Sequence, residues 1–356
     1  MRICFLHPEP NYSGGCRVVA IYAEGLAALG HEVLIVCAFG RPRSRNPIKW
    51  LKNIAQKKSD REHLEKSHFS GLSNVGIKLF PGKKVLKDGD IPDSDVVIAT
   101  WWKTASWVNR LRESKGKKFY FVQHHEIHPH FPIREVEASY RYPMEKIVIA
   151  NWLAKVMAEK YGDTNVKLVP NAVDKSMFYS DKQPDSSSTV FCTMYSKRKF
   201  KGFDVTISAF LHAKKIHPNI QLIIFGREDI VRNASIDGVT ILENPSQSQI
   251  RETYARSDGY IFSSRTEGFG LPILEALACG CPVIATKAGC AVDYIQPGKN
   301  GYLSDVDDVL SQSTSIQKIT AMTNAERLIM RNHSISSVTN VSWENSIVLF
   351  ENALIG

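Results

Sequence analysis

Short apolar runs alternate with amphipathic stretches along most of the chain, and this pattern predicts buried parallel strands joined by helices. In the first half, the predicted strands are residues 2–6, 32–38, 95–100, 118–123, 147–150 and 166–170. In the second half, they are residues 189–194, 221–225, 259–262 and 282–286. The predicted helices are residues 17–29, 152–160, 202–216, 249–255 and 343–354. This β-α order predicts an α/β fold of doubly wound sheets with right-handed crossovers.

A polar segment rich in serine, aspartate and proline interrupts the alternation near residue 180. Such a composition favours a linker. A chain of 356 residues is also too long for one ordinary core. We therefore predict a first domain over residues 1–178, a linker over 179–188 and a second domain over 189–342. No short repeat or low-complexity tract is present.

The most informative stretch follows the predicted strand 259–262. A glycine-bearing loop leads into a helix that opens with Pro272, a residue suited to the first helical turn. Glycines 268 and 270 let backbone amides approach a ligand, and amides at a helix N-terminus favour phosphate. The carboxylates of Glu267 and Glu275 suit sugar and ribose hydroxyls. Phosphate, ribose and sugar together indicate a nucleotide sugar.

This stretch resembles the E-x7-E signature of the retaining glycosyltransferases of family 4. Both glutamates, the glycines, the proline and the ACG-PVIAT tail of residues 278–286 fall at the family spacing. The resemblance implies a GT-B architecture: two doubly wound Rossmann-like domains facing each other across a cleft. It also implies that a C-terminal helix, residues 343–356, crosses back to the first domain, which is the acceptor side, while the second binds the donor.

The resemblance further implies roles for individual residues. Glu267 would contact the hydroxyls of the donor sugar, and Glu275 would contact the ribose. The backbone around Gly268, Phe269, Gly270 and Leu271 would hold the diphosphate. The pair Gly14–Gly15 lies at the family's N-terminal glycine loop and would approach the donor from the opposite wall.

Lys201 matches the family lysine that neutralises the leaving diphosphate. The family places an arginine upstream of it, and that arginine is missing here. Arg198 or Lys197 would replace it from a shifted loop. No metal motif is present, and we expect lysine, backbone amides and the helix dipole to stabilise the diphosphate without a metal or cofactor.

Histidines gather where the predicted strand 118–123 ends. The family often places one histidine here against the donor sugar, and spacing does not decide between His124 and His125. Either one suits acid-base chemistry or a structural role. His128 and His130 follow, which raises a zinc hypothesis, but no partner ligand has matching spacing.

Composition limits the partners and the location. The net charge is +9, and residues 41–66 hold nine basic and three acidic side chains around Trp50. This basic amphipathic segment suits an anionic membrane surface, and the alternative is a solvated helix that caps the domain. No nucleic-acid motif accompanies the charge. We interpret the seven cysteines as reduced and buried, and the first apolar run as a strand and not a signal peptide. We therefore expect a cytoplasmic protein. If the basic segment binds the membrane, the protein would be peripheral on its inner face.

The resemblance implies a retaining, metal-independent glycosyltransferase. It would move a sugar from a nucleoside-diphosphate sugar to a hydroxyl of a glycan or lipid-linked glycan, in cell-surface polysaccharide or glycolipid synthesis. Two alternatives keep the fold: a nucleotide-sugar-binding protein without catalysis, which the missing arginine motivates, and a sugar-nucleotide epimerase. A Rossmann dehydrogenase is disfavoured, because no G-x-G-x-x-G follows the first strand.

Overall fold

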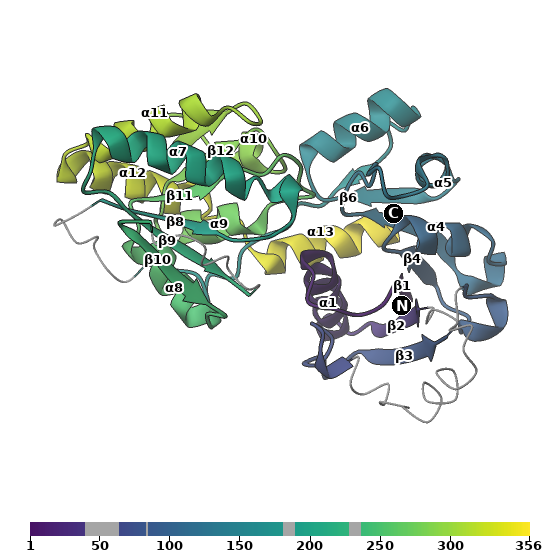
Figure 1. The fold of residues 1–356 in the computed structure, drawn as a ribbon. Coiled ribbons are helices and arrows are strands. Elements are labelled where there is room, and N and C mark those ends of the chain that lie inside the picture. The colour runs from purple at the N-terminus through teal and green to yellow at the C-terminus, as the bar shows by residue number, and fades with distance from the viewer. Residues whose placement is uncertain (40–63, 83–84, 181–188, 228–235) are drawn as a thin grey trace, which may run out of the picture. The chain divides into compact units, whose positions relative to one another are not determined.

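The computed structural model describes the chain except for residues 40–63, 83–84, 181–188 and 228–235. The described residues form two compact units (Figure 1). The first comprises Met1–Asn171 and Glu344–Gly356, and the second comprises Ala172–Trp343. The division falls within the predicted first domain, at the P-N-A-V-D turn of residues 170–174. Most of the predicted linker and of the basic segment 41–66 lies outside the described residues, so the membrane surface stays a prediction.

The first unit is built on a sheet whose strand order is β3-β2-β1-β4-β5-β6-β7. Its strands are β1 (Arg2–His7), β2 (Glu32–Phe39), β3 (Gly76–Pro81), β4 (Val96–Ala99), β5 (Lys117–Val122), β6 (Glu145–Val148) and β7 (Lys167–Leu168). Each pair of neighbouring strands is parallel. The central strands are buried, as their apolar runs predict.

Over the described part of the first unit, the helices are α1 (Gly14–Ala28), α4 (Trp102–Asn109), α5 (Ile133–Ser139), α6 (Asn151–Tyr161) and α13 (Trp343–Ile355). The described residues of this unit also include the 3-10 turns η1 (Asp88–Asp90) and η2 (Glu113–Lys115). Helix α1 begins three residues before its predicted start at Arg17. The reason is an N-cap: the Ser13 hydroxyl accepts a hydrogen bond from the Cys16 amide at 3.3 Å. Gly14 and Gly15 therefore form the first turn of the helix and not a separate loop.

The C-terminal helix α13 packs on the first unit beside α1 (Figure 1). The Phe350 ring stacks on Tyr22 with 4.5 Å between centroids and meets the edge of Phe121 at 5.0 Å. Gly25 permits this approach, since a Cβ there would lie 2.2 Å from Ile347 Cδ1. A contact of 2.7 Å between His31 Nε2 and Glu351 Oε1 fixes the far end. The end of the chain thus completes the first unit, as the resemblance implied.

The second unit has a sheet of order β10-β9-β8-β11-β12-β13, again parallel throughout. Its strands are β8 (Val190–Met194), β9 (Gln221–Gly226), β10 (Val239–Glu243), β11 (Gly259–Phe262), β12 (Val283–Thr286) and β13 (Gly301–Ser304). Its helices are α7 (Phe203–Ile216), α8 (Gln247–Arg256), α9 (Leu271–Ala278), α10 (Ala291–Tyr294), α11 (Val309–Thr320) and α12 (Asn324–Ser337), with the 3-10 turn η3 (Lys199–Lys201) before α7.

All seven cysteines are free and buried. Cys4, Cys16 and Cys37 belong to the first unit, and Cys192, Cys279, Cys281 and Cys290 belong to the second. Burial raises the pKa of Cys16 to about 11 and that of Cys279 to about 12, so these thiols stay protonated near neutral pH.

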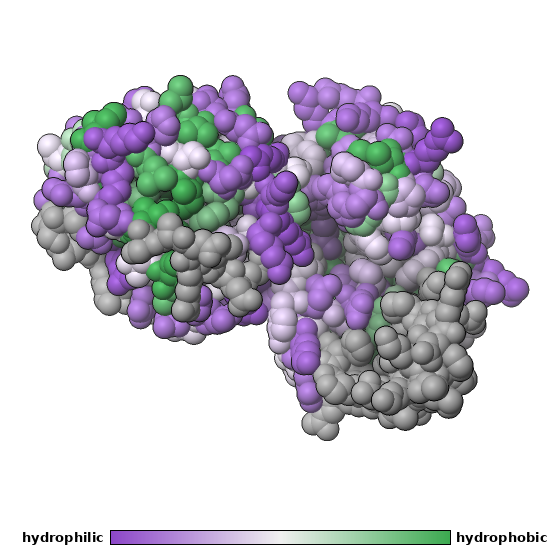
Figure 2. Space-filling model, in the orientation of Figure 1, coloured by the Kyte–Doolittle hydropathy of each residue, from purple (hydrophilic) through white to green (hydrophobic). Residues whose placement is uncertain are grey.

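Hydrophilic residues cover much of the face shown in Figure 2, while hydrophobic residues gather in patches on the second unit. Exposed large apolar side chains of that unit include Leu211, Ile216, Ile241, Leu310 and Ile329. Among the described residues, the helices are all too short or too polar to cross a membrane.

Candidate functional site

The strand order of the second unit fixes where a ligand is expected. From β8 the chain proceeds to β9 and β10 on one side, and it then returns to β11, β12 and β13 on the other. In open parallel sheets, ligands bind outside the carboxyl ends of the strands at this switch point. The loops that follow β8 and β11 flank it. They carry Lys201 and Glu267, respectively.

These two residues, far apart in sequence, meet in the structure. Lys201 Nζ lies 2.6 Å from Glu267 Oε1, and the Ser264 hydroxyl donates to the same oxygen at 2.6 Å. The Glu267 side chain is 9% exposed and the Lys201 side chain 22% exposed. The pair is therefore shielded from water on most sides, and its charges are screened less than those of surface pairs.

The backbone brings the two loops into close contact. Gly202 follows Lys201 with φ +66°, and a Cβ there would lie 1.9 Å from the Ser263 carbonyl oxygen. Only glycine fits this position, because it accepts the left-handed conformation and adds no side chain. Glycine at 202 thus lets the lysine loop lie directly on the loop that carries Glu267.

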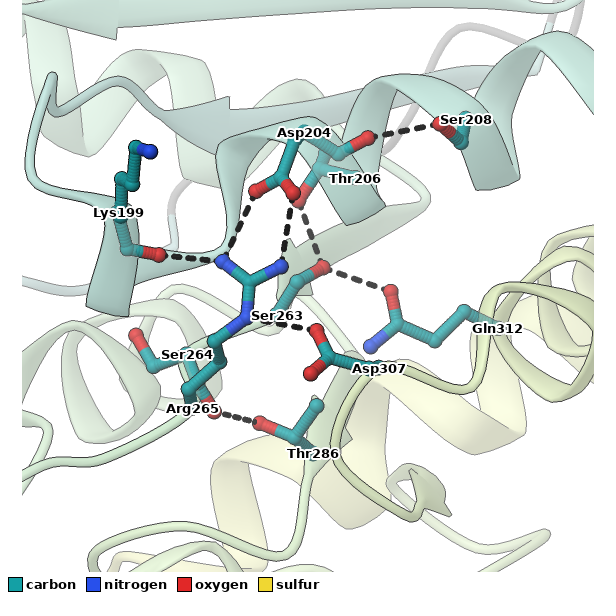
Figure 3. Close-up of polar contacts among 10 residues, drawn as sticks. All are labelled: Lys199, Asp204, Thr206, Ser208, Ser263, Ser264, Arg265, Thr286, Asp307 and Gln312. Carbon is teal, nitrogen blue, oxygen red and sulfur yellow. Dashed lines mark hydrogen bonds and ion pairs between the residues drawn. The ribbon is translucent and has the colours of Figure 1, made fainter.

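A polar network surrounds Ser263 and Ser264, at the start of the loop that carries Glu267 (Figure 3). The Ser263 hydroxyl donates to Gln312 Oε1 at 2.7 Å and receives the Thr206 hydroxyl at 2.7 Å. The Thr286 hydroxyl donates to the Ser264 carbonyl oxygen at 2.5 Å. Helices α7 and α11 and strand β12 therefore all hold the start of the Glu267 loop in place.

Helix α9 begins at Leu271 behind this loop. Its N-cap is Gly270, with φ +96° and no capping side chain, so a side chain does not occupy the amides of the first turn. The loop is braced from behind: the Cys290 amide donates to the Phe269 carbonyl at 2.7 Å, and a Cβ on Gly289 would lie 2.2 Å from that oxygen. A helix N-terminus of this kind suits a phosphate.

Glu275 lies within α9 and is 8% exposed. Burial first, and then the charges of neighbours that include Glu275, raise the pKa of Tyr254 well above its usual range. The two glutamates of the motif thus occupy different elements: Glu267 is in the loop, and Glu275 is on the helix.

Arg198 stands at the N-cap of η3 and is exposed. Its guanidinium carbon lies 6.0 Å from the centroid of the Phe200 ring, and Lys201 Nζ lies 5.7 Å from the same ring. The two cations flank one aromatic side chain at the start of α7. Arg198 as a replacement for the missing family arginine stays a prediction.

In the first unit, the two histidines that follow β5 have different surroundings. His125 Nε2 lies 2.8 Å from the Tyr161 hydroxyl, and burial, with nearby Lys160 and neighbouring histidines, lowers the pKa of His125 to about 4. The His124 ring lies 5.2 Å from His128 and 6.1 Å from Trp152, by centroids. His125 is tied into a tyrosine cluster, so His124 is the better candidate for a ligand contact.

Glu126, which the sequence interpretation missed, follows this pair. Burial raises the pKa of Glu126 to about 8, against hydrogen bonds from the Trp102 amide and the Trp101 side chain, which lower it. Its own amide donates to the Tyr140 hydroxyl at 2.9 Å, and that hydroxyl donates to the His124 carbonyl at 3.0 Å. A carboxyl that stays protonated near pH 7 marks a functional-site candidate. Its place directly after the strand-end histidines was the available signal.

Trp101 and Trp102 follow β4, whose neighbour β1 leads to Gly14 and Gly15. The β1–β4 boundary is the switch point of the first sheet, so these residues lie where its ligands are expected. A Cβ on Gly14 would meet nothing within 4 Å, and one on Gly15 would meet only the Gln123 side chain at 3.6 Å. Within the described residues, His, Cys, Asp and Glu side chains form no group of three or more arranged to hold a metal ion.

Comparisons with known sequences agree on the second unit. Residues 178–334 match the model of the family described as "Glycosyl transferases group 1". D-inositol 3-phosphate glycosyltransferase of Segniliparus rotundus is 26% identical over 200 residues, which cover 50% of this chain and 44% of that protein. N-acetyl-alpha-D-glucosaminyl L-malate synthase of Bacillus anthracis is 28% identical over 158 residues, covering 40% and 41%. The chain thus spans less than half the length of these curated relatives.

Comparisons with solved structures extend over the whole chain. Sucrose-phosphate synthase from Thermosynechococcus elongatus superposes with a TM-score of 0.73 at 16% identity, covering 99% of this chain and 98% of that one. Anabaena Alr3699/HepE in complex with UDP and glucose also gives 0.73 at 16% identity, covering 100% and 99%. These likenesses show that the fold is the GT-B architecture, as the sequence resemblance implied.

Proposed function

We propose that this chain, whose residues 178–334 match the model of the group 1 glycosyl transferases, moves a glycosyl group from a nucleoside-diphosphate sugar to a hydroxyl of a glycan or lipid-linked glycan. The observation that carries the proposal is the 2.6 Å contact between Lys201 and Glu267 at the switch point of the second sheet. A cation and a carboxylate side by side suit the two halves of such a donor, because one half is an anionic diphosphate and the other is a ring of hydroxyls.

In the proposed reaction, the bond between the anomeric carbon and the diphosphate oxygen breaks, and a bond forms from that carbon to the acceptor hydroxyl oxygen. The hydroxyl proton leaves with the diphosphate or to solvent. Lys201 and the first-turn amides of α9 neutralise the charge that develops on the diphosphate, without a metal ion. We propose that the new bond lies on the same face of the sugar as the old one, so the anomeric configuration is retained.

Donor binding requires the ion pair to change partners. Lys201 and Glu267 neutralise each other in the structure, and the incoming donor offers the lysine a diphosphate and the carboxylate a set of hydroxyls. Lys201 would then face an anionic diphosphate, and the Glu267 carboxylate would accept hydrogen bonds from hydroxyls. This avoids the cost of leaving a buried charge without a partner.

Titration of nucleoside diphosphates tests the donor site first. We expect one of UDP, GDP, dTDP and CDP to bind the purified chain most tightly, and Glu275→Ala to weaken that ligand about tenfold or more, since a ribose hydroxyl would lose its charged acceptor. Isothermal titration measures both. Glu252→Ala, on the exposed side of α8, is the control that should leave affinity unchanged.

Two outcomes would contradict the proposal. One is that the four diphosphates all fail to bind, and the other is that Glu275→Ala binds the preferred one as tightly as the wild type. A changed sugar without release of the free nucleoside diphosphate would instead indicate an epimerase.

We place the acceptor at the carboxyl edge of the first sheet, where Trp101, His124 and Glu126 gather. An aromatic ring packs against the apolar face of a sugar, while a protonated carboxyl and an imidazole bond its hydroxyls. The support is the position at the β1–β4 switch point together with the raised pKa of Glu126.

Glu126→Gln tests the state of that carboxyl. The folded chain keeps the Glu126 proton up to a pH of about 8, whereas an unfolded glutamate loses it near its ordinary pKa of 4.5. Between these values the unfolded state binds fewer protons, so the free energy of unfolding falls as pH rises. In Glu126→Gln, we expect this pH-dependent loss of unfolding free energy, on the order of a few kcal/mol in the wild type, to disappear.

Urea denaturation at pH 5.5 and pH 8.5 measures this effect. The wild type should lose more stability between the two pH values than Glu126→Gln does. The exposed Glu135 of α5, changed to glutamine, is the control and should follow the wild type. Parallel pH dependence in wild type and Glu126→Gln would show that the carboxyl is ionised at neutral pH.

A further inference from the structure

Arg265 joins three segments of the second unit (Figure 3). Its Nη1 and Nη2 donate to Asp204, in the first turn of α7, at 3.0 and 2.7 Å. Its Nε donates to Asp307, in the turn after β13, at 2.7 Å. Nη1 also donates to the carbonyl oxygen of Lys199 in η3. The guanidinium fork is thus occupied on both edges, and the α7 contact is bidentate.

The backbone of Arg265 repeats the connection. Its amide donates to the Phe200 carbonyl oxygen at 2.7 Å. Phe200 immediately precedes Lys201, and Arg265 stands two residues before Glu267. The side chain and the backbone of Arg265 therefore both join the turn η3 to the loop that carries Glu267. These contacts do not involve the Lys201–Glu267 ion pair itself.

This network differs from an ordinary surface salt bridge. Exposed pairs contribute about 0–1 kcal/mol, but a bidentate arginine in a network of several charges is the exception. The Arg265 side chain is 29% exposed, and its hydrogen bonds lower the pKa of Asp204. Two of the contacted segments are η3, which carries Lys201, and α7, which begins two residues later at Phe203.

Asp307 adds a second, independent sign of constraint. With φ +63°, it is one of two described non-glycine residues in the left-handed region. Such a conformation costs free energy for a residue with a side chain, and it persists where the surroundings require it. Here it accompanies the placement of the Asp307 carboxylate on Arg265 Nε.

The exchange of partners proposed above raises a positional problem. Once a diphosphate takes Lys201 and sugar hydroxyls take Glu267, their mutual contact no longer holds the two loops together. Other contacts must then keep both groups aimed at one ligand, because small displacements of reacting groups cost large factors in rate.

We propose that Arg265 is a positioning residue that holds η3 and the Glu267 loop in register, so that Lys201 and Glu267 stay directed at the same donor after their ion pair has separated. This inference rests on the proposed function for the identity of the donor. The occupant it requires is a nucleoside diphosphate, since the diphosphate is the part that reaches Lys201.

The first test compares affinities for a diphosphate and its monophosphate, UDP with UMP or GDP with GMP, whichever pair the wild type binds. In Arg265→Met, we expect diphosphate affinity to fall about tenfold and monophosphate affinity less than twofold, because only the outer phosphate needs the positioned lysine. Arg265→Lys should recover part of the lost diphosphate affinity. In Arg265→Met, kcat should fall by a larger factor than KM rises. Arg251→Met, an arginine of α8 near the other end of α9, is the matched control.

A purely structural role would give a different result. Diphosphate and monophosphate affinities would then fall together with the melting temperature, and an unchanged ratio between them would overturn the proposal. Asp307→Asn, which leaves the Asp204 contact, should reproduce the change of ratio at smaller size and keeps the test valid if Arg265→Met unfolds.

A second test needs no ligand and separates this inference from the proposed function. The Lys201–Glu267 coupling is measured by urea denaturation of Lys201→Met, Glu267→Gln and the double variant, in wild-type and Arg265→Met backgrounds. We expect the coupling to shrink by at least half in the second background. Equal coupling in both backgrounds would show that Arg265 does not position the pair. If the coupling shrinks in the Arg265→Met background but the wild type binds no nucleotide, only the donor assignment is rejected.

Discussion

Glu267→Gln is expected to lower kcat by about a thousandfold while the fold survives. Glutamine keeps the size of the side chain, and its amide oxygen still accepts from Ser264 and Lys201, so the loop has no reason to move. What it loses is the negative charge that sugar hydroxyls would bind. The measurement is the release of nucleoside diphosphate from nucleotide sugars that carry the nucleotide identified by titration, with a glycan extract as the acceptor.

The controls for this experiment lie in the same unit. Glu252→Gln, on exposed α8, should keep full activity, and the melting temperature of Glu267→Gln should stay within a few degrees of the wild type. If Glu267→Gln turns over at the wild-type rate, the carboxylate takes no part in the reaction. The assignment of the E-x7-E loop as the donor site then fails.

Lys201→Met is expected to lower kcat by about a hundredfold or more, because the leaving diphosphate loses its cation. It should also destabilise the fold by about 2 kcal/mol, because Glu267, with a side chain 9% exposed, is left charged without its partner. The loss of stability and the loss of activity should respond differently to a second substitution. The double variant Lys201→Met/Glu267→Gln should regain stability, while its activity should stay low.

Urea denaturation and steady-state kinetics on the two single variants and the double variant measure these effects. Lys287→Met is the matched control, since its pair with Asp305 at 2.8 Å is exposed on both sides and should contribute little. A Lys201→Met variant as active as the wild type would remove the basis for metal-independent departure of the diphosphate. A double variant less stable than Lys201→Met would contradict the described ion pair.

Strong periodicity made much of the fold predictable. The runs 2–6, 32–38 and 259–262 are strands in the structure, because an uninterrupted apolar run bounded by turn residues suits a buried parallel strand. Strand β3 was missed: it lies at the edge of its sheet, and Lys78 interrupts its apolar residues. Helix α12 was missed despite a capping box in which Thr323 and Glu326 cap each other.

The candidate site was predictable only as far as local motifs reach. The spacing of Glu267, Gly270 and Glu275 indicated a donor loop, and Lys201 came from the family pattern. The contact between Lys201 and Glu267 depends on the strand order of the sheet, which neither segment contains. Glu126 acquires its raised pKa from burial beside Trp101 and Trp102, and the sequence around Glu126 does not record that environment.

Alkylation of the buried cysteines can measure how often each unit opens. A thiol-alkylating reagent reacts only with thiolate that has reached solvent, so the cysteines of a native, closed unit are not modified. The rate at which Cys4, Cys16 and Cys37 are modified would give the rate at which the first unit opens. The rate for Cys192, Cys279 and Cys281 would give that of the second unit. Mass spectrometry of peptides from one labelling time course therefore yields two local stabilities from the unmodified chain, without an introduced probe.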